Sequence, residues 1–335
     1  MLQRKYTVRF TTPAFLGNAE QEGQWRTPPF KHLLREWWRV AWAEEHGYPA
    51  DVSKMRAEEA RLFGSAADGA SNKSLLRIRL DKWDRGTKSK WPSTATVKHP
   101  EVKGGMAVDS ALYLGYGPVK KAGELNHAPA IDAGEMVTLR LAFPDDDNAR
   151  LLMRALEMMS WFGAIGGRSR NGWGSFMLLG EESVEPEIKT RDWKECLEYE
   201  WAHAIGGDEQ GPLMWWTESF GRWEDVIAYL AELKIALRTS FPFTTGKDAA
   251  KPEARHWLSY PVSNSHSVKG WGNKRLPNSL RFKVRKDESG KLYGVIFHMP
   301  CKPPSDFRPD RATLIKVWSS VHKFLDAEGG LQRGR

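Results

Sequence analysis

Short stretches of the chain alternate apolar and polar residues, a pattern that predicts half-buried β-strands. The first such stretch covers 6–10 and is stopped by Pro13. Three further strands are expected over 75–80, 136–143 and 173–179. The stretches 6–10 and 75–80 would each bury one face and leave the other face polar.

Between these strands, apolar residues recur with helical spacing. From Phe30 to Trp42 they follow an i, i+3, i+4 pattern, with Thr27 placed as the N-cap and Pro28 at the first helical position. A second helix, with its core face over 151–162, is expected to be capped by the aspartates 145–147. The order strand, helix, strand, strand, helix, strand is that of a ferredoxin-like domain.

The second half contains elements of the same kinds. A helix is expected over 223–233, a strand over 234–239 and a helix over 311–325. A hairpin over 280–299 turns at 287–290. We therefore predict an α+β protein made of two tandem ferredoxin-like (RRM-type) domains with antiparallel sheets and loop insertions. RRM domains bind single-stranded RNA on the open face of such a sheet.

A length of 335 residues suits two domains, each with its own core. We place the N-terminal domain over 1–183 and the C-terminal domain over 184–335, with an acidic connector over about 181–211. Residues 81–134 are rich in Gly, Pro, Lys and Ser and lack periodicity. This composition predicts a basic functional insertion or a mobile loop within the first domain.

The formal net charge of +8 is segregated along the chain. The segment 73–103 contains nine Lys and Arg residues and three acidic residues, and the segment 234–286 contains twelve Lys and Arg residues and two acidic residues. The segment 181–232, in contrast, contains fourteen acidic and four basic residues. Two basic blocks suit a surface that binds phosphate in two places. The alternative is three solvated faces without function.

The sequence argues against several other classes of protein. Only Cys196 and Cys301 are present, without the spacing of a zinc site or a disulfide framework. We expect no metal and no other cofactor. The N-terminus lacks an apolar signal region and no window is apolar enough to span a membrane, so a cytoplasmic location is expected.

A glycine-rich run over 163–174 lies between a helix and a strand. Its glycines permit positive φ angles and a close approach of phosphate to the backbone, and its two arginines can bind phosphate. The run is not a P-loop, which would follow a strand and open a helix. An alternative is an extended C-cap and turn. The candidate RNA contacts in this run are Gly166, Gly167, Arg168, Ser169, Arg170 and Asn171.

The first helix carries Lys31, Arg35 and Arg39 every four residues, opposite its Trp and Leu stripe. Such a row can follow phosphates, although a solvated basic face fits equally well. The three tryptophans of the stripe, 37, 38 and 42, are expected in the core. His32 lies beside the basic row as a further candidate contact.

No set of residues predicts a catalytic or metal site. His32 is a candidate general base for RNA cleavage, but no neighbour supplies a defined partner. His256, His266 and His298 lack metal-ligand spacing, and the aspartates 145–147 are explained as helix caps.

Several ordered motifs resemble the RAMP superfamily. They are Pro13 to Gln21, Arg26 to Arg39, Leu62 to Ser65 and the run 163–174. More narrowly, the N-terminal half is similar to the first subunit of the Cmr complex, a type III-B CRISPR effector. Asn18 and His32 stand where that family usually has glycine.

The resemblance implies tandem ferredoxin-like domains and assembly with other Cmr subunits around guide RNA and target RNA. It implies a place near the 3′ end of the guide and a part in target capture, without cleavage by this subunit. Two alternatives stay open, a metal-independent endoribonuclease that processes guide RNA through His32 and a subunit that is mainly a protein scaffold.

Overall fold

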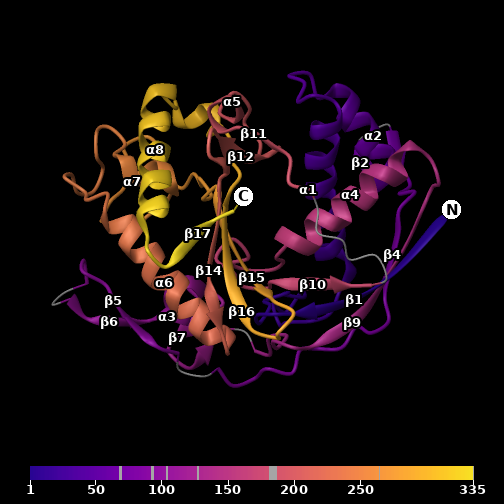
Figure 1. Ribbon diagram of the computed structural model, residues 1–335, viewed down its shortest axis with the longest axis horizontal. Coiled ribbons are helices and arrows are strands. Elements are labelled where there is room, and N and C mark those ends of the chain that lie inside the picture. Colours follow the sequence, from indigo (N-terminus) through magenta and orange to yellow (C-terminus); the bar gives the residue numbers. More distant parts are fainter. Residues whose placement is uncertain are drawn as a thin grey trace.

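The computed structural model describes residues 1–67, 70–91, 94–102, 105–126, 128–180, 187–263 and 265–334. The chain forms two lobes, and each lobe is built around a four-stranded antiparallel sheet (Figure 1). The proposed boundary between 183 and 184 falls among residues 181–186, which lie outside the described residues.

The first sheet has the strand order β10-β1-β9-β4. Its strands are β1 (Leu2–Phe10), β4 (Arg77–Leu80), β9 (Met136–Phe143) and β10 (Phe176–Leu179). Helices α1 (Thr27–Glu45) and α4 (Asp147–Phe162) lie together on one face of it (Figure 1). Two central strands flanked by the second and fourth strands define the ferredoxin-like topology.

The second sheet repeats this arrangement in the order β15-β16-β14-β17. Its strands are β14 (Met214–Phe220), β15 (Leu280–Lys286), β16 (Leu292–His298) and β17 (Leu331–Arg333). Helices α6 (Trp223–Thr239) and α8 (Arg311–Ala327) cover one side (Figure 1). The predicted fold class of two tandem ferredoxin-like domains is therefore confirmed.

Two local predictions were wrong. Thr27 is the first helical residue of α1 and Arg26 is the N-cap, which makes no side-chain capping bond. The strand predicted over 234–239 is the last part of α6. Because α6 packs against its sheet and also against the insertion, Ile235 and Leu237 are both buried and imitate the alternation of a strand.

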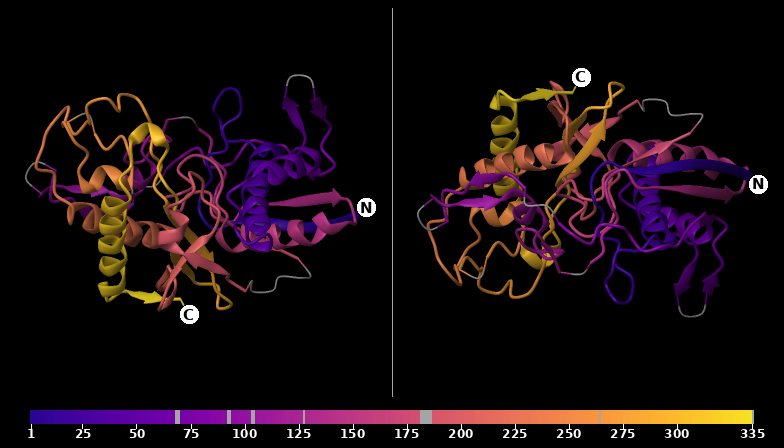
Figure 2. Two further views of the ribbon diagram at one scale, coloured as in Figure 1. Left: turned by 90° about the horizontal axis from the view of Figure 1, so that it is seen from above. Right: turned by 90° about the horizontal axis from the view of Figure 1, so that it is seen from below.

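The described part of the predicted insertion 81–134 forms short elements. They are β5 (Thr96–Lys98), β6 (Ala107–Asp109), α3 (Ser110–Gly115), β7 (Val119–Lys121) and β8 (Glu124–Leu125). Figure 2 shows them beside α6, and the buried side chains of Trp91, Leu114 and Val119 belong to the same apolar cluster as that helix. The insertion thus packs on the second lobe although it belongs to the first lobe in sequence.

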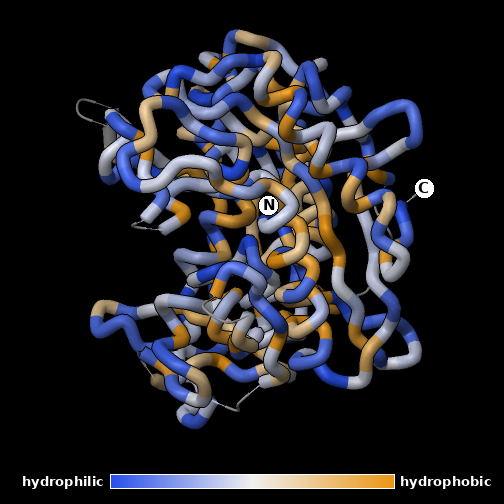
Figure 3. The backbone as a smooth tube through the Cα atoms, turned by 90° about the vertical axis from the view of Figure 1, so that its left-hand side faces the viewer, coloured by the Kyte–Doolittle hydropathy of each residue, from blue (hydrophilic) through white to orange (hydrophobic). Residues whose placement is uncertain are grey.

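Several smaller elements complete the fold. They are α2 (Ser53–Phe63), β2 (Ser65–Ala67), β3 (Ala70–Asn72), β11 (Thr190–Asp192), α5 (Trp193–Cys196), β12 (Ile205–Asp208), β13 (Gly211–Pro212) and α7 (Ala254–Leu258). Apolar stretches concentrate in the interior of the chain trace (Figure 3). None of the helices in the described ranges combines the length and apolar character that crossing a membrane requires.

Strand β15 joins the two lobes. The Lys283 side chain is fully buried, and its Nζ donates to the carbonyls of Ser160, Gly163 and Phe176 at 2.8, 2.6 and 2.7 Å. Two of these carbonyls belong to the C-terminal end of α4, where unpaired carbonyls and the helix dipole favour a cation. A side chain of the second lobe therefore caps a helix of the first.

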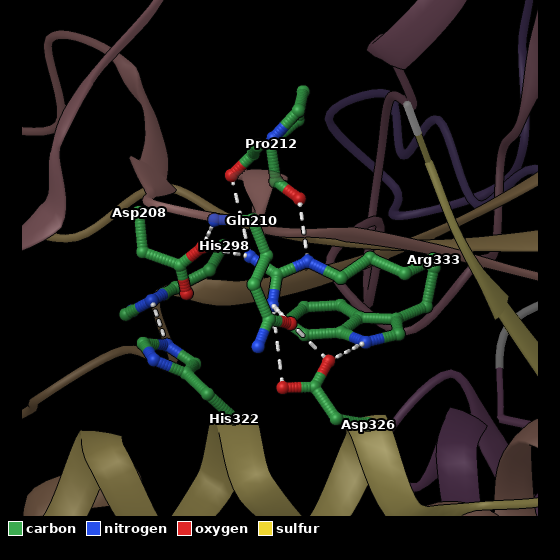
Figure 4. Close-up of polar contacts among 9 residues, drawn as sticks. Asp208, Gln210, Pro212, His298, His322, Asp326 and Arg333 are labelled. Atoms are coloured by element: carbon green, nitrogen blue, oxygen red, sulfur yellow. Dashed lines mark hydrogen bonds and ion pairs between the residues drawn. The ribbon is translucent and has the colours of Figure 1, made fainter.

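The last strand is held by a polar network around Arg333 (Figure 4). Its guanidinium contacts Asp208 at 2.5 Å and Asp326 at 3.2 Å. Nearby, Nδ1 of His298 lies 2.9 Å from Nε2 of His322. These contacts fix β17 and α8 against the second sheet.

Candidate nucleic-acid interface

The two sides of α1 face different surroundings. Leu33, Trp37 and Trp38 are buried, as the helical pattern predicted for the tryptophans. On the side that carries the basic row, Arg35 and Arg39 both donate to the carboxylate of Glu59 in α2. The basic row is therefore partly neutralised by a carboxylate that the sequence did not reveal.

Lys31 and Arg35 line neither of the pockets that border α1. Lys31 is half-buried, and burial together with the nearby charge of Arg35 lowers its pKa. Of the four predicted contacts on this helix, His32 and Arg39 line pockets.

The glycine-rich loop, residues 163–174, makes a tight backbone crossing. A Cβ atom at Gly174 would lie 1.9 Å from the carbonyl oxygen of Ile165, and one at Gly166 would lie 2.6 Å from that of Phe15. Both glycines also have positive φ angles. At these two positions the glycines are required by packing, as the turn interpretation expects.

The middle of the loop is open to a ligand. Among the described residues, no hydrogen bond uses the backbone amides of Arg168, Ser169 or Arg170. Arg168 has a left-handed φ of 60°. Consecutive amides in such a turn form a concave donor surface that suits an anion.

Two adjoining pockets form one groove between the lobes, which we call the central groove. They measure about 290 and 240 Å³ and share Glu36, Trp37, Arg170 and Arg281. Helix α1 forms one wall, and the glycine-rich loop and the start of β15 form the other. Gly166 and Ser169 also line the groove, so the structure brings part of the loop and part of α1 together, although Arg35 and Arg168 line neither pocket.

Arg170 and Arg281 are neighbouring cations in this groove. Within the described chain, neither guanidinium makes an ion pair with a carboxylate, and Nε of Arg281 is buried without a hydrogen-bond partner. The Arg170 guanidinium donates to the carbonyl of Asn278, at 3.4 Å. Burial and the charge of Arg170 lower the pKa of Arg281 to about 10, while Glu36 opposes this effect.

Sequence reasoning did not select Arg281 as a contact because it lies in the second half, where the resemblance over 275–282 is only loose and the motifs that carry the family match are absent. The signal was its place at the start of a strand with cations at 281, 283 and 285. Arg170 and Arg281 are partly buried like charges that repel each other, and Glu36, which lines both pockets, offsets this repulsion only in part. The groove therefore favours an anionic ligand.

His32 lies at the mouth of the groove with its side chain 74% exposed. Its Nε2 atom is 3.6 Å from Oε1 of Glu36, so the statement that no neighbour supplies a partner was wrong. The two residues are one helical turn apart, which explains their approach.

Asn171 has an internal role in the structure. Its amide donates to the carbonyl of Leu114 at 2.7 Å and accepts from Lys234 at 2.6 Å. Burial and the charges of Arg238 and Arg168 lower the pKa of Lys234 to about 7. Asn171 thus connects the loop, the insertion and α6, and its predicted contact with RNA stays a prediction.

Arg168 points toward the insertion. Its Nε donates to the carbonyl of Tyr116 at 2.6 Å, and it lines neither part of the central groove. Gly167 lines a different pocket, bordered by Phe15 and Pro118. The predicted contacts therefore divide into those in the groove and those beside the insertion.

The remaining histidines and acids have structural surroundings. Asp146 caps α4 by accepting from the amide of Asn148 at 3.0 Å, which confirms the capping role predicted for this cluster. His256 accepts from the amide of Glu253 at 2.9 Å. In the described ranges, no three His, Cys, Asp or Glu side chains gather in a way that would hold a metal ion.

Comparison with known proteins adds independent information. A sequence model of the RAMP superfamily matches residues 7–176. No curated protein matches the chain. In the crystal structure of Cmr1 from Pyrococcus furiosus in its apo form, the similar chain is 15% identical, with 96% of this chain and 97% of that chain covered and a TM-score of 0.50.

A second similar chain occurs in a cryo-EM structure of the type III-B Cmr-beta complex bound to cognate target RNA. It is 12% identical, with 96% of this chain and 99% of that chain covered and a TM-score of 0.49. At sequence identities this low, similarity to a solved structure is evidence for a shared fold and not for a shared function. The RAMP match, by contrast, covers about half of the sequence and includes α1 and the glycine-rich loop, and it shows that this chain belongs to the RAMP superfamily.

Proposed function

We propose that this chain is a non-catalytic RNA-binding subunit of a type III-B CRISPR effector, the Cmr complex, in the cytoplasm. It contacts guide and target RNA near the 3′ end of the guide, helps to capture target RNA and binds other Cmr subunits. Membership of the RAMP superfamily and the fold shared with Cmr1 of Pyrococcus furiosus support this proposal.

The observation that carries the proposal is the pair Arg170 and Arg281 in the central groove. Both guanidiniums lack a carboxylate partner among the described residues, and they come from different lobes. A phosphodiester placed between them would accept charge-assisted hydrogen bonds and remove their mutual repulsion. RNA carries such phosphates at regular intervals, so a strand can lie along the groove.

Other groove residues extend this contact. Ser169 and the open amides of the loop can donate to further phosphate oxygens, and Trp37 forms part of the floor with its indole N–H unpaired among the described residues. We keep Lys31, Arg35 and Arg39 in the proposed contact set as flanking cations. Arg168 contributes from the insertion side.

The pair His32 and Glu36 supports a second candidate, the endoribonuclease. A carboxylate beside an imidazole can orient it as a general base toward a ribose 2′-hydroxyl. Incubation of the purified chain with repeat-containing RNA tests this candidate. Cleavage that disappears in His32→Ala but persists in Lys316→Ala would establish it and overturn the non-catalytic proposal.

The leading proposal is tested by fluorescence anisotropy with single-stranded RNA at several salt concentrations. We expect submicromolar binding that weakens steeply with salt. Arg170→Ala/Arg281→Ala should lower the affinity by at least tenfold, given about 1 to 3 kcal/mol for each phosphate contact. Lys316→Ala, which removes an exposed charge from α8, is the control.

Two results would contradict RNA binding in the groove. One is binding that does not respond to salt. The other is an equal loss of affinity in the Lys316→Ala control and in the double variant. Full RNA affinity in the double variant, with loss of partner binding, would favour the scaffold function instead.

A further inference from the structure

A third pocket borders the glycine-rich loop at Gly167, one residue from Gly166 in the central groove. We call it the loop pocket. It measures about 430 Å³ and lies between residues 15–23, which overlap a RAMP-like motif, and four residues of the insertion, Gly117, Pro118, Asn126 and Pro129. A ligand that occupies the central groove therefore passes close to the entrance of a second, separate site.

The lining of the loop pocket is neutral, unlike that of the central groove. None of its lining residues is ionisable, whereas the groove contains His32, Glu36, Arg170 and Arg281. The polar side chains in the loop pocket are the amides of Asn18, Gln21 and Asn126. A site of this kind suits an uncharged, hydrogen-bonding ligand, because a buried ion would find no counter-charge there.

The three side-chain amides differ in their bonding, and all retain capacity for further hydrogen bonds. Oδ1 of Asn18 accepts from the amide of Glu22 at 2.9 Å. In the described part of the chain, no hydrogen bond uses the side chains of Gln21 and Asn126. Each free amide offers two donors and an acceptor, the groups that recognise the hydrogen-bonding edge of a nucleobase.

The backbone of the 17–23 loop fixes Gln21 at the pocket. Gln21 has a φ of 63°, which is unusual for a residue with a side chain. Its amide donates to the carbonyl of Asn18 at 3.0 Å, and a bridge between Gly17 and Gly23 closes the loop. A strained conformation that is held by its surroundings is often a sign of a functional position.

Flat apolar surfaces complete the pocket. They are the ring of Phe15 and the rings of Pro118 and Pro129. The Phe15 ring is itself held by Trp91 and Trp173, with centroids 5.6 and 5.4 Å away. Such surfaces stack favourably with a planar base.

A cation and an exposed aromatic ring lie at the edge of this pocket. A Cβ atom on Gly117, one of the lining residues, would be 3.6 Å from Nη2 of Arg168. Tyr116, whose carbonyl accepts from Arg168, is 67% exposed. Arg168 can thus bind the phosphate of a nucleotide whose base enters the pocket, and Tyr116 can stack with an adjacent base.

We propose that the loop pocket binds one unpaired nucleobase of the RNA, with Arg168 on the phosphate of the same nucleotide. This inference rests on the proposed RNA-binding function. It adds a site for a base to a groove that binds the sugar–phosphate backbone. Sequence-specific recognition of RNA depends on such unstacked bases.

The test uses the full chain and two short single-stranded RNAs, one normal and one with stable abasic positions. The variant Gln21→Met/Asn126→Leu removes the two free amides while keeping side-chain size. Asn72→Leu/Gln332→Met is the matched control, because it removes two exposed side-chain amides that lie away from the loop pocket, on β3 and β17. The readout is the affinity ratio between normal and abasic RNA for each protein.

We expect the native chain and the control to prefer normal RNA, and the pocket variant to bind normal RNA about tenfold more weakly, with the ratio approaching one. An unchanged ratio in the pocket variant overturns the base site. If the RNA still binds and Arg170→Ala/Arg281→Ala still weakens it, only the base site has failed. If the native chain binds no RNA, the proposed function fails and the base site with it.

Discussion

Arg39 makes two hydrogen bonds to the buried carboxylate of Glu59, Nε to Oε2 at 2.6 Å and Nη2 to Oε1 at 2.8 Å. Arg35 donates to the same carboxylate. Burial raises the pKa of Glu59, but the bonds and charges of both arginines outweigh it and hold this pKa below its usual value. One acid therefore restrains two of the cations that the sequence presents as a free basic row.

The variant Glu59→Gln should bind RNA more tightly and be less stable. Without the carboxylate, Arg35 and Arg39 are free to reach phosphates, so a gain of a few-fold in affinity is expected. Losing the ion pairs between the buried carboxylate and these two partly exposed arginines should lower the free energy of unfolding by about 1 to 2 kcal/mol. Anisotropy and denaturant titration measure the two effects. Glu58→Gln on the same helix is the control, and a weaker RNA complex in Glu59→Gln alone would show that the paired geometry is the binding one.

The variant Lys283→Met should destabilise the fold strongly. It leaves the carbonyls of Ser160, Gly163 and Phe176 without their donor in a buried position. We expect a loss of about 3 kcal/mol in the free energy of unfolding, because unsatisfied buried polar groups cost about 1 to 3 kcal/mol each. Lys291→Met, at the exposed end of the same hairpin, should stay within about 0.5 kcal/mol of the native chain. Equal midpoints for both variants would contradict the capping role.

Stability should fall as the pH drops below about 6.5. Burial, with Arg333 adding to it and Asp208 opposing it, lowers the pKa of His322 to about 3. Burial and His322 lower the pKa of His298 well below its usual value. The unfolded chain therefore binds protons that the folded chain does not bind. Between the pKa of a histidine in the unfolded chain and its lower pKa in the folded chain, each such histidine lowers the free energy of unfolding by about 1.4 kcal/mol per pH unit.

Melting temperatures between about pH 7.5 and pH 5 measure this effect, since most carboxylates stay ionised in that range. His322→Gln keeps a polar group next to His298 but does not titrate, so its melting temperature should depend less on pH. A native chain whose melting temperature stays constant over this range would contradict the assignment of neutral, buried imidazoles.

The variant Arg140→Thr should stabilise the chain. Arg140 pairs directly with Lys5 on one side and with Arg79 on the other, so three cations lie in a row across β1, β9 and β4. Like charges opposite one another weaken a sheet by about 0.2 to 1 kcal/mol. Arg77→Thr is the matched control, because Arg77 faces Ala142. Thermal unfolding should show a gain for Arg140→Thr and none for the control.

The first lobe was predictable because its elements carry clear periodicities. Strand β9 coincides with the predicted range 136–143, and α4 begins within the predicted acidic cap 145–147, with Asp146 as the N-cap. Strand β14 has no such signal. Its sequence Met214 to Phe220 starts with three large apolar residues rather than alternation, because both of its faces are covered at that end.

The candidate site was predictable only on the side that holds the RAMP-like motifs. Gly166, Ser169, Arg170 and His32 line the central groove, but Arg281 emerges only in three dimensions. The alternation over 281–285 resembles a strand with a solvated cationic face. In the fold, the first lobe covers that face, and Lys283 and Arg285 are buried.

The position of Lys283 also bears on how the molecule responds to heat or force. Separating the lobes would expose an ammonium group and three carbonyls at once and would open an apolar cluster to which Phe297 and Met299 of the second half belong. Neither half forms a complete hydrophobic core by itself, because this apolar cluster contains residues from both. The chain should therefore melt in a single cooperative step, and each half produced alone should be prone to aggregate.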